Sequence, residues 1–400
     1  MKKLLLAASA MSLIAGAAVA EDVKIGTLLG ITGPIESISP NMFASVDLAI
    51  KEVNDSGKAA NGWVFQSVRA DSTCIDAAAA SAAAERLITV EGIKGLVGGD
   101  CSGVTRAVLT NLAMPNGLVM VSPSATSPAL TADPDNGLFF RTAPSDAREG
   151  EVMADILTEK GVKSIALTYS NSDYGKGLAE AIASAFTAKG GVVTINAAHD
   201  DGKADYSAEV AALAAAGGDL LVVAGYLDQG GKGIIQASLD SGAFSTFGLP
   251  GGMVGDSLPA AIGPALDGSY GQVAQSDSPG AAILAEMGKK NDPAYDATSP
   301  YSMESYDAAA LIMLAMEASG STDSNVYKEK IMEIANGPAD GSGVKILPGE
   351  LGKALDLIAA GTAIDYDGAS GVTLIGPGES AGRYKQFEVK GGKYETVQFR

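Results

Sequence analysis

The strongest constraint on the fold of this chain is an alternation of short apolar runs with segments of helical periodicity. Apolar runs such as 23–29 are typical of buried parallel strands, and each is followed by a segment with apolar residues on one helical face. In the helix predicted over 41–56, Phe43, Val46 and Ile50 fall on such a face. A repeated strand–helix order predicts parallel sheets joined by right-handed crossovers.

The alternation runs through the chain twice, which predicts two lobes. We expect strands of the first series over 23–29, 63–70, 95–97, 118–121 and 138–142, with helices over 41–56, 76–90 and 102–114. We expect strands of the second series over 164–169, 192–196, 219–224, 245–249 and 269–274, with helices over 146–160, 174–189, 205–216 and 228–241. The predicted fold class is therefore α/β, with two doubly wound parallel-sheet lobes.

The pattern changes after residue 278. Four predicted helices have no strands of their own; they cover 281–289, 302–319, 324–336 and 349–360. The end of the chain predicts antiparallel strands over 371–375, 383–389 and 393–399, with Lys390-Gly391-Gly392 as a hairpin turn.

The first residues have the pattern of a signal peptide. Lys2 and Lys3 form a basic start, residues 4–17 form an apolar segment, and small residues end at Ala20. Cleavage after Ala20 makes Glu21 the first mature residue, and no cysteine follows the site to carry a lipid anchor. No other run approaches the roughly 18–20 apolar residues that a membrane span needs. We therefore expect a soluble, exported protein.

Length and charge narrow the range of partners. A chain of 400 residues exceeds one typical domain, in agreement with two lobes. The formal net charge is −19, and removal of Lys2 and Lys3 makes it −21 for the mature chain. Such an acidic protein is not expected to bind nucleic acid or an anionic membrane surface.

The two cysteines, Cys74 and Cys101, suggest one disulfide bond in an oxidising compartment. The single histidine, His199, lies in the polar segment 198–202, where we expect a surface loop. We expect neither a metal site nor a cofactor from these residues.

Enzyme motifs are also missing, because no nucleophile elbow and no dinucleotide loop follows a predicted strand. The segment 225–232 resembles a phosphate-binding loop, but its glycine spacing is wrong. We therefore expect no enzyme.

Polar loops at the predicted strand ends mark the candidate ligand site. The loop 122–128 is rich in Ser, Thr and Pro, and ligands of open α/β sheets bind beyond the carboxyl ends of strands. Ser102 begins a helix whose free N–H groups favour an anion. Tyr174 and Tyr226 follow strands of the second series. Each residue alone is more often a helix cap or a packed aromatic, but together they describe a cleft between two lobes.

Several motifs, in their order and spacing, resemble those of a known family. They are Thr32-Gly33-Pro34, Cys74 with Gly99-Asp100-Cys101-Ser102, the loop 122–128, Phe140-Arg141-Thr142, the segment 173–177, Gly225-Tyr226 and the segment 364–371. The whole mature chain resembles the type I periplasmic solute-binding proteins of ABC importers, in particular the branched-chain amino-acid (Leu/Ile/Val) binding group.

This resemblance implies a domain arrangement. Two lobes joined by a three-crossing hinge are expected to close on a small solute. The crossings are expected near Thr142, Ser278 and Asp365. The first lobe would then comprise residues 21–141 and 279–365, and the second lobe residues 142–278 and 366–400. The resemblance also implies a periplasmic location, a permease partner in the inner membrane and a monomer.

The resemblance implies site residues as well. In the family, residues at the positions of Ser102, Ser124, Ala125 and Thr126 hold the α-carboxylate and ammonium of the solute. Tyr174 and Tyr226 match second-lobe positions that complete the site on closure, and Cys74 and Cys101 match the disulfide of the family.

One departure concerns the loop after the predicted strand 245–249. Family members that bind amino acids usually carry an acid there to pair the ammonium, whereas this chain has Gly251 and Gly252. A buried ammonium without a carboxylate partner is costly. Either Asp256 or Glu36 substitutes for the acid, or the ligand is not a plain amino acid. We include Gly251 and Glu36 in the expected site, although Glu36 fits a solvated loop acid equally well.

Three functions remain open from the sequence. The first is the solute-binding component of an ABC transporter that captures a small amino acid or related carboxylate. The second is an extracytoplasmic sensor for a small amide or carboxylate, and the third is an exported α/β enzyme. We expect transport, because no signalling domain is attached. The sequence does not name the solute.

Overall fold

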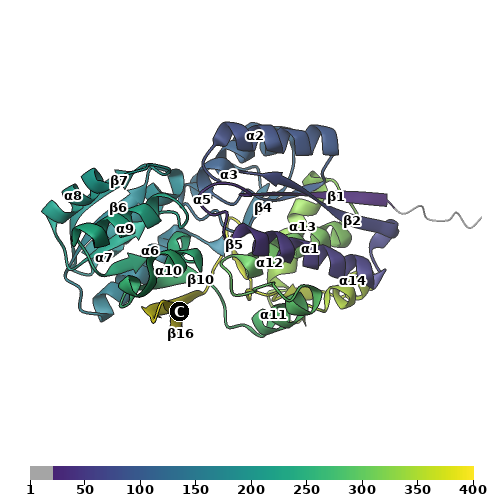
Figure 1. Ribbon diagram of the computed structural model, residues 1–400. Helices are drawn as coiled ribbons and strands as arrows, with labels where there is room; N and C mark the ends of the chain where they lie inside the picture. The colour runs from purple at the N-terminus through teal and green to yellow at the C-terminus, as the bar shows by residue number, and fades with distance from the viewer. Residues whose placement is uncertain (1–20) are drawn as a thin grey trace, which may run out of the picture.

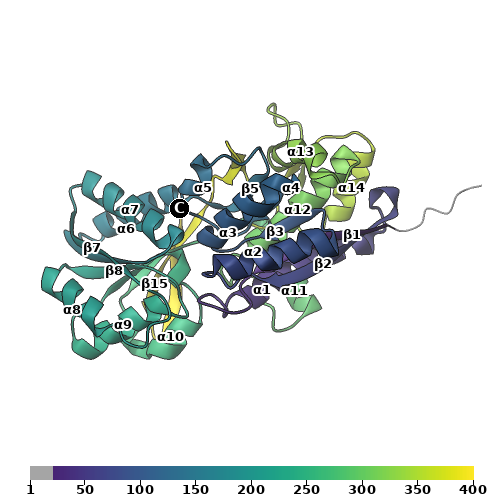
Figure 2. The same ribbon diagram turned by 90° about the horizontal axis from the view of Figure 1, so that it is seen from above.

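The computed structural model describes residues 21–400, which form two α/β lobes (Figures 1 and 2). The predicted signal peptide lies outside the described residues. In Figure 1 the purple-to-blue start of the chain and the lime-green helices α12 and α13 share one lobe, while the teal middle of the chain forms the other.

The strands are β1 Glu21–Leu29, β2 Trp63–Asp71, β3 Gly95–Gly98, β4 Met120–Ser122, β5 Phe139–Pro144, β6 Ser164–Ser170, β7 Val192–His199, β8 Leu220–Ala224, β9 Phe247–Leu249, β10 Tyr270–Ala274, β11 Val344–Ile346, β12 Ile364–Tyr366, β13 Leu374–Ile375, β14 Glu379–Ser380, β15 Tyr384–Lys390 and β16 Lys393–Phe399. The helices are α1 Ser39–Ser56, α2 Ala77–Arg86, α3 Ser102–Val108, α4 Met114–Asn116, α5 Ala129–Ala132, α6 Asp146–Glu159, α7 Asp173–Ala188, α8 Ser207–Ala216, α9 Gly230–Ser241, α10 Ser257–Ile262, α11 Pro279–Asn291, α12 Ser302–Ser319, α13 Ser324–Asn336 and α14 Leu351–Ala359.

Each lobe is built on a seven-stranded sheet. The first sheet has the order β13-β14-β5-β4-β3-β1-β2, and the second has the order β16-β15-β10-β9-β8-β6-β7. Strands β1 to β5 pair in parallel, as do strands β6 to β10. The predicted class of two doubly wound α/β lobes is therefore confirmed. A third, two-stranded sheet pairs β11 with β12.

The late helices that lacked strands complete the first lobe. Residues 302–317 of α12 are all buried, as expected for a helix that is packed on every side. This helix lies against β3, β4 and β5 and contacts α1, α13 and α14. It fills the face of the first sheet opposite α2, which packs on β1 and β2.

The last hairpin belongs to the second lobe. Strand β15 pairs antiparallel with both β10 and β16, as predicted for the end of the chain. Gly391 and Gly392 have φ values of 57° and 69°, the left-handed conformation that a tight two-residue hairpin turn requires.

The third chain passage between the lobes differs from the expected one. The short strand β14 pairs with β5, and β13 pairs with β14, so both belong to the first sheet. The chain passes to the second sheet between Ser380 and Tyr384, and not at Asp365. Strands of two residues carry no periodicity of their own, so the apolar run at 371–375 did not indicate which sheet it joins.

The prediction of a surface loop at His199 is wrong. His199 is the last residue of β7 and is 2 % exposed. Its Nδ1 lies 2.9 Å from Thr168 Oγ1, and burial lowers its pKa to about 4. The strand extends beyond the predicted end at Asn196, and the polar residues that suggested a loop begin only with Asp200.

Candidate functional site

Asp100 connects the loops that follow four strands of the first sheet, three through its carboxylate and one through its backbone carbonyl. The carboxylate accepts hydrogen bonds from the Gly30 amide at 2.5 Å, the Ser72 hydroxyl at 2.6 Å and the Cys101 amide at 3.0 Å. The Asp100 carbonyl accepts from the Ser124 hydroxyl at 2.9 Å. The loops after β1, β2, β3 and β4 are thereby fixed in one position at the carboxyl end of the sheet.

The start of α3 is held beside this carboxylate. Cys101 precedes the helix and forms a disulfide with Cys74, as predicted, with the two Cα atoms 5.1 Å apart. Ser102 is the first helical residue and is buried, and its hydroxyl accepts a hydrogen bond from the Ser127 amide at 3.1 Å. The helix N-terminus and the loop 122–128 therefore form one polar surface, suited to an anionic group.

Arg141 holds the loop 122–128 in place through hydrogen bonds from its guanidinium group. Its guanidinium donates to the Ala125 carbonyl at 3.1 Å and to the Ser127 carbonyl at 2.9 Å. It also pairs with Glu379 of β14 at 2.5 Å. Thr126 lies between the two bonded carbonyls, and its buried hydroxyl has no hydrogen-bond partner. The loop thus presents an unpaired hydroxyl from a rigid backbone.

The second lobe supplies an aromatic wall. Tyr174 in the first turn of α7 and Tyr226 after β8 stack with their ring centres 5.1 Å apart. Both are buried, and the Tyr174 hydroxyl accepts from the Gly252 amide at 3.0 Å. Adding a side chain at Gly252 would place its Cβ 2.5 Å from that hydroxyl. The glycine therefore allows the loop after β9 to approach the ring closely.

A small cavity separates these walls. Its lining residues are Ile35, Ile38, Asp100, Cys101, Ser102, Ser124, Tyr174, Tyr226, Gly252 and Tyr301. The cavity volume is about 20 Å³, room for roughly one water molecule. A solute of amino-acid size therefore requires the lobes to part or the lining side chains to shift.

The expected site residues occupy different places around this cavity. Ser102, Ser124, Tyr174 and Tyr226 line it. Ala125, Thr126 and Gly251 are buried but are not among the lining residues.

The two acids considered as ammonium partners both lie away from the cavity lining. Glu36 and Asp256 are exposed. Neither is among the groups nearest to Gly251, which belong to Tyr301 and Glu149.

The structure instead places a different acid beside Gly251. Glu149 of α6 is buried, and its Oε1 accepts from the Gly251 amide at 2.7 Å and from Gln272 Nε2 at 3.2 Å. A Cβ added to Gly251 would lie 3.4 Å from Glu149 Oε1 and 3.0 Å from the Tyr301 hydroxyl. Burial raises the pKa of Glu149 to about 7.

A second buried acid accompanies it one helical turn earlier. Asp146 is fully buried, and neither of its carboxylate oxygens has a hydrogen-bond partner. Burial, followed by repulsion from Glu149, raises its pKa well above the usual value. Sequence reasoning missed this pair, because acids in the first turn of a helix usually face solvent and complement the helix dipole. Only their position directly after β5, at a passage between lobes, could have indicated burial.

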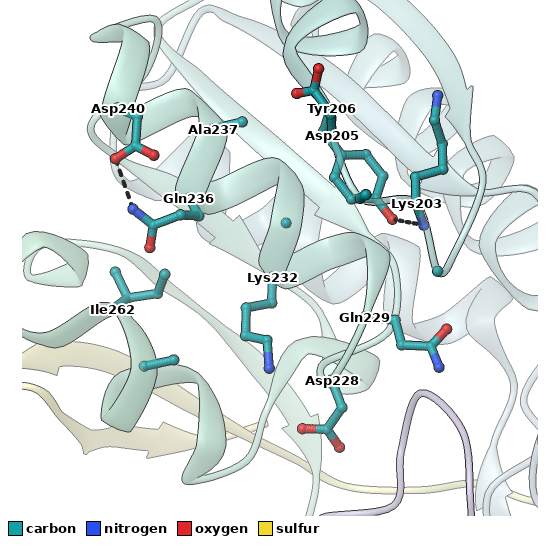
Figure 3. A pocket seen from close by; sticks show the side chains of 14 residues that line it. Lys203, Asp205, Tyr206, Asp228, Gln229, Lys232, Gln236, Ala237, Asp240 and Ile262 are labelled. Atoms are coloured by element: carbon teal, nitrogen blue, oxygen red, sulfur yellow. Dashed lines mark hydrogen bonds between the residues drawn. The ribbon is translucent and has the colours of Figure 1, made fainter.

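A larger hollow lies elsewhere, on the second lobe (Figure 3). Its volume is about 660 Å³, and Lys203, Asp205, Gln236 and Asp240 are exposed residues at its rim. Figure 3 shows Gln236 bonded to Asp240, at 2.8 Å. This open hollow carries both signs of charge and lacks the facing walls of the interlobe cavity.

Two further properties concern the described part of the chain as a whole. Within residues 21–400, no helix is long and apolar enough to cross a membrane. The same residues contain no group of three or more His, Cys, Asp or Glu side chains placed to hold a metal ion.

Two α/β lobes with a polar and aromatic cavity between them define a type I periplasmic binding protein. The chain belongs to the periplasmic binding protein family, whose sequence pattern matches residues 22–336.

Two proteins are similar to this chain in sequence, and a third is similar in fold. The Leu/Ile/Val-binding protein homolog 3 of Brucella melitensis is 30% identical over 321 residues, which cover 78% of this chain and 83% of that protein. The chemotactic signal transduction system substrate-binding protein BasB of Halobacterium salinarum is 29% identical over 374 residues, which cover 88% of this chain and 83% of that protein. A solute-binding protein of an ABC transporter from Rhodopseudomonas palustris, solved with p-hydroxybenzoic acid, has a TM-score of 0.77 at 20% identity, covering 95% of this chain and 97% of that one.

Proposed function

We propose that the protein is the extracytoplasmic solute-binding component of an ABC transporter. It captures a small amino acid or a related carboxylate between its lobes and delivers it to a permease in the inner membrane. It acts in the periplasm as a monomer and catalyses no reaction. Membership of the periplasmic binding protein family supports this proposal.

The observation that carries the proposal is the meeting of two chemically different walls at one cavity. The first lobe contributes the start of α3 and hydroxyls at Ser102 and Ser124, which suit a carboxylate. The second lobe contributes the stacked rings of Tyr174 and Tyr226. Since neither lobe encloses the solute alone, binding favours the closed arrangement of the lobes.

The test is a thermal-shift screen of the mature protein, residues 21–400, against amino acids, their deaminated acids and aromatic carboxylates. A ligand present at about a thousand times its Kd stabilises the folded state by roughly 4 kcal/mol. We expect such a shift with at least one carboxylate-bearing solute, together with a smaller radius of gyration in solution scattering. Absence of any shift across the screen contradicts the proposal.

A second candidate function is ligand sensing. It is supported by the similarity to BasB, which is named as part of a chemotactic signal transduction system. The two functions differ in what deletion of the gene removes. Loss of uptake of the labelled solute indicates transport, whereas loss of the response to the solute with uptake intact indicates sensing.

A further inference from the structure

The loop after β9 has no carboxylate at Gly251, but the carboxylate of Glu149 on helix α6 lies beside this loop. Gly251 is where an acid was expected, and the Glu149 carboxylate lies against its backbone amide at 2.7 Å. The Gly251 position has little room for a side chain, since a Cβ there would meet the Tyr301 hydroxyl at 3.0 Å. Glu149 and a larger residue at 251 would therefore compete for the same space.

Asp146 adds an acceptor that the protein itself leaves unsatisfied. Both of its oxygens are buried without hydrogen-bond partners, which is unusual for an acid inside a protein. The Thr126 hydroxyl faces this carboxyl closely enough to lower its pKa, against the larger effect of burial, although the two groups make no hydrogen bond of ordinary geometry. Because the Asp146 amide donates to the Thr126 carbonyl at 2.8 Å, the two residues are fixed relative to each other.

No basic side chain is available to neutralise this pair among residues 21–400. Arg141 is the cation whose charge acts on Asp146. Its N–H groups are already donated to two loop carbonyls, to the Thr131 hydroxyl and to Glu379. The Glu149 carboxyl faces neutral donors, which are the Gly251 amide, the Gln272 amide group and the Asp146 carboxyl. Two buried acids with this arrangement can accept a cation from outside the chain.

The pair lies behind the cavity lining: neither acid lines the cavity, but Glu149 bonds the Gly251 amide, and a Cβ at Gly251 would lie 3.0 Å from the hydroxyl of Tyr301, which does line it. The charge of Glu149 raises the pKa values of Tyr174 and Tyr301, after the larger effect of their burial. Both tyrosines line the cavity. Aromatic rings beside carboxylates are a favourable surrounding for an ammonium group, because the ring faces also attract cations.

We propose that Glu149, with Asp146 and the Thr126 hydroxyl, accepts the ammonium group of the solute, so that the protein selects α-amino acids. This inference rests on the proposed function and assigns its substrate class. The carboxylate of the solute binds at the start of α3, and its ammonium binds at the start of α6. Thr126 lies between the two ends. The acid that pairs with the ammonium thus lies on helix α6 and not in the loop after β9.

The first test uses the unaltered mature protein and matched sets of ligands. Each standard amino acid is compared by calorimetry with its deaminated acid and its decarboxylated amine; for leucine these are 4-methylpentanoate and 3-methylbutylamine. We expect at least one amino acid to bind roughly a hundred-fold more tightly than either of its partners. Tighter or equal binding of a deaminated acid, or of an amine alone, overturns the inference.

The second test uses Glu149→Gln and the control Glu317→Gln. Glu317 is also a buried glutamate that accepts backbone hydrogen bonds, from the Ala60 amide at 2.8 and 3.1 Å, but it lies near the far end of α12. We expect Glu149→Gln to weaken binding of the amino acid by roughly ten- to a hundred-fold while binding of the deaminated acid changes less than about three-fold. Glu317→Gln should leave both unchanged. Equal losses for both ligands in Glu149→Gln would indicate a structural role only.

The outcomes separate the inference from the proposed function. If deaminated acids bind and close the lobes but amino acids do not, the function stands and the ammonium site is wrong. If no carboxylate-bearing compound binds, the proposed function fails as well. Should Glu149→Gln not fold, the ligand sets on the unaltered protein still decide between these outcomes.

Discussion

Asp228 of the second lobe accepts two hydrogen bonds from Ser37 of the first lobe. Its Oδ2 lies 3.0 Å from the Ser37 amide nitrogen and 2.7 Å from the Ser37 hydroxyl. On its own lobe, the other oxygen accepts from the Ser257 hydroxyl at 2.6 Å, which fixes the orientation of the carboxylate. This contact joins the β1 loop to the β8 loop at the edge of the cleft and stabilises the closed arrangement.

Replacing Asp228 with alanine should therefore favour the open arrangement. We expect the variant to lose about 0.5–1.5 kcal/mol of closure free energy, and its ligand-free radius of gyration to increase in solution scattering. Asp240→Ala is the control, because that acid bonds only within its own helix, to Gln236. An unchanged scattering profile for Asp228→Ala, with unchanged ligand affinity, would show that the contact does not contribute to closure.

Arg141→Lys should disturb the loop that carries Thr126. Lysine cannot reach both loop carbonyls and Glu379 together, so we expect the free energy of unfolding to fall by roughly 2–4 kcal/mol, with weaker ligand binding. The control is Arg383→Lys at the exposed pair with Asp277, where the change should stay within about 0.5 kcal/mol. Urea unfolding of the two variants measures both values. Equal effects would contradict the role assigned to Arg141.

Gly252→Ala should damage the aromatic wall. The new Cβ would lie 2.5 Å from the Tyr174 hydroxyl and 2.6 Å from the Gly225 carbonyl oxygen, so one of the two must move. We expect ligand affinity to fall by at least about ten-fold, in keeping with the usual cost of overpacking. Gly103→Ala is the matched control, because nothing lies within 4 Å of its added Cβ. That control should bind ligand with unchanged affinity in the same titration calorimetry. Unchanged affinity of Gly252→Ala would show that this loop does not contribute to the ligand site.

Stability should decrease as the pH rises from about 6.5, where His199 no longer contributes, to about 8, and should then level off. Burial raises the pKa of Glu149 to about 7 and that of Glu304 to about 8, from 4.5. The folded protein therefore holds protons that the unfolded chain has lost, and this stabilisation disappears as the pH passes these values. His199, with its pKa lowered to about 4 from 6.5, acts in the opposite direction but below this range. Urea unfolding across the range should show a smaller decrease for Glu304→Gln, and a flat profile for the unaltered protein would contradict the expectation.

Ligand affinity should change with pH in the opposite direction. A bound ammonium keeps Glu149 ionised, so binding at a pH of about 6 must release the proton that the free site carries. Affinity should rise up to a pH of about 7 and then level off. The polar groups that face Glu149 are Asp146, Tyr174, Gln272, Tyr301 and Tyr384. Calorimetry in phosphate and Tris buffers counts the released proton, which should be absent in Glu149→Gln.

The fold could be predicted from the sequence because its signal is repeated and local. Every strand expected before residue 278 is present, since apolar runs and helical faces alternate without interruption. Strands β13 and β14 could not be assigned, because strands of two residues have no pattern. The position of His199 depended on how far β7 extends, and its polar neighbours concealed that extension.

The site was predictable only in part. The loops with Ser102, Ser124, Tyr174 and Tyr226 lie at strand ends, so the topology brings them together. Glu36 and Asp256, which were considered because they are close in sequence to the cleft loops, are exposed and do not line the cavity. From the sequence, Asp146 and Glu149 resemble the exposed acids that commonly occupy the first turn of a helix. Their burial arises because the first turn of α6 meets the loop 122–128 of the first lobe and the loop after β9 of the second lobe, and no local sequence pattern indicates these contacts.

The four-loop attachment of Asp100 has a consequence for how the specificity of such a protein changes. The first-lobe half of the cavity is cross-linked by Asp100, by the Cys74–Cys101 bridge and by Arg141, so a substitution there disturbs several loops at once. The second-lobe half rests on two stacked rings and a glycine. A change in the first lobe therefore affects several loops together, whereas a change in the aromatic wall of the second lobe affects fewer parts of the fold.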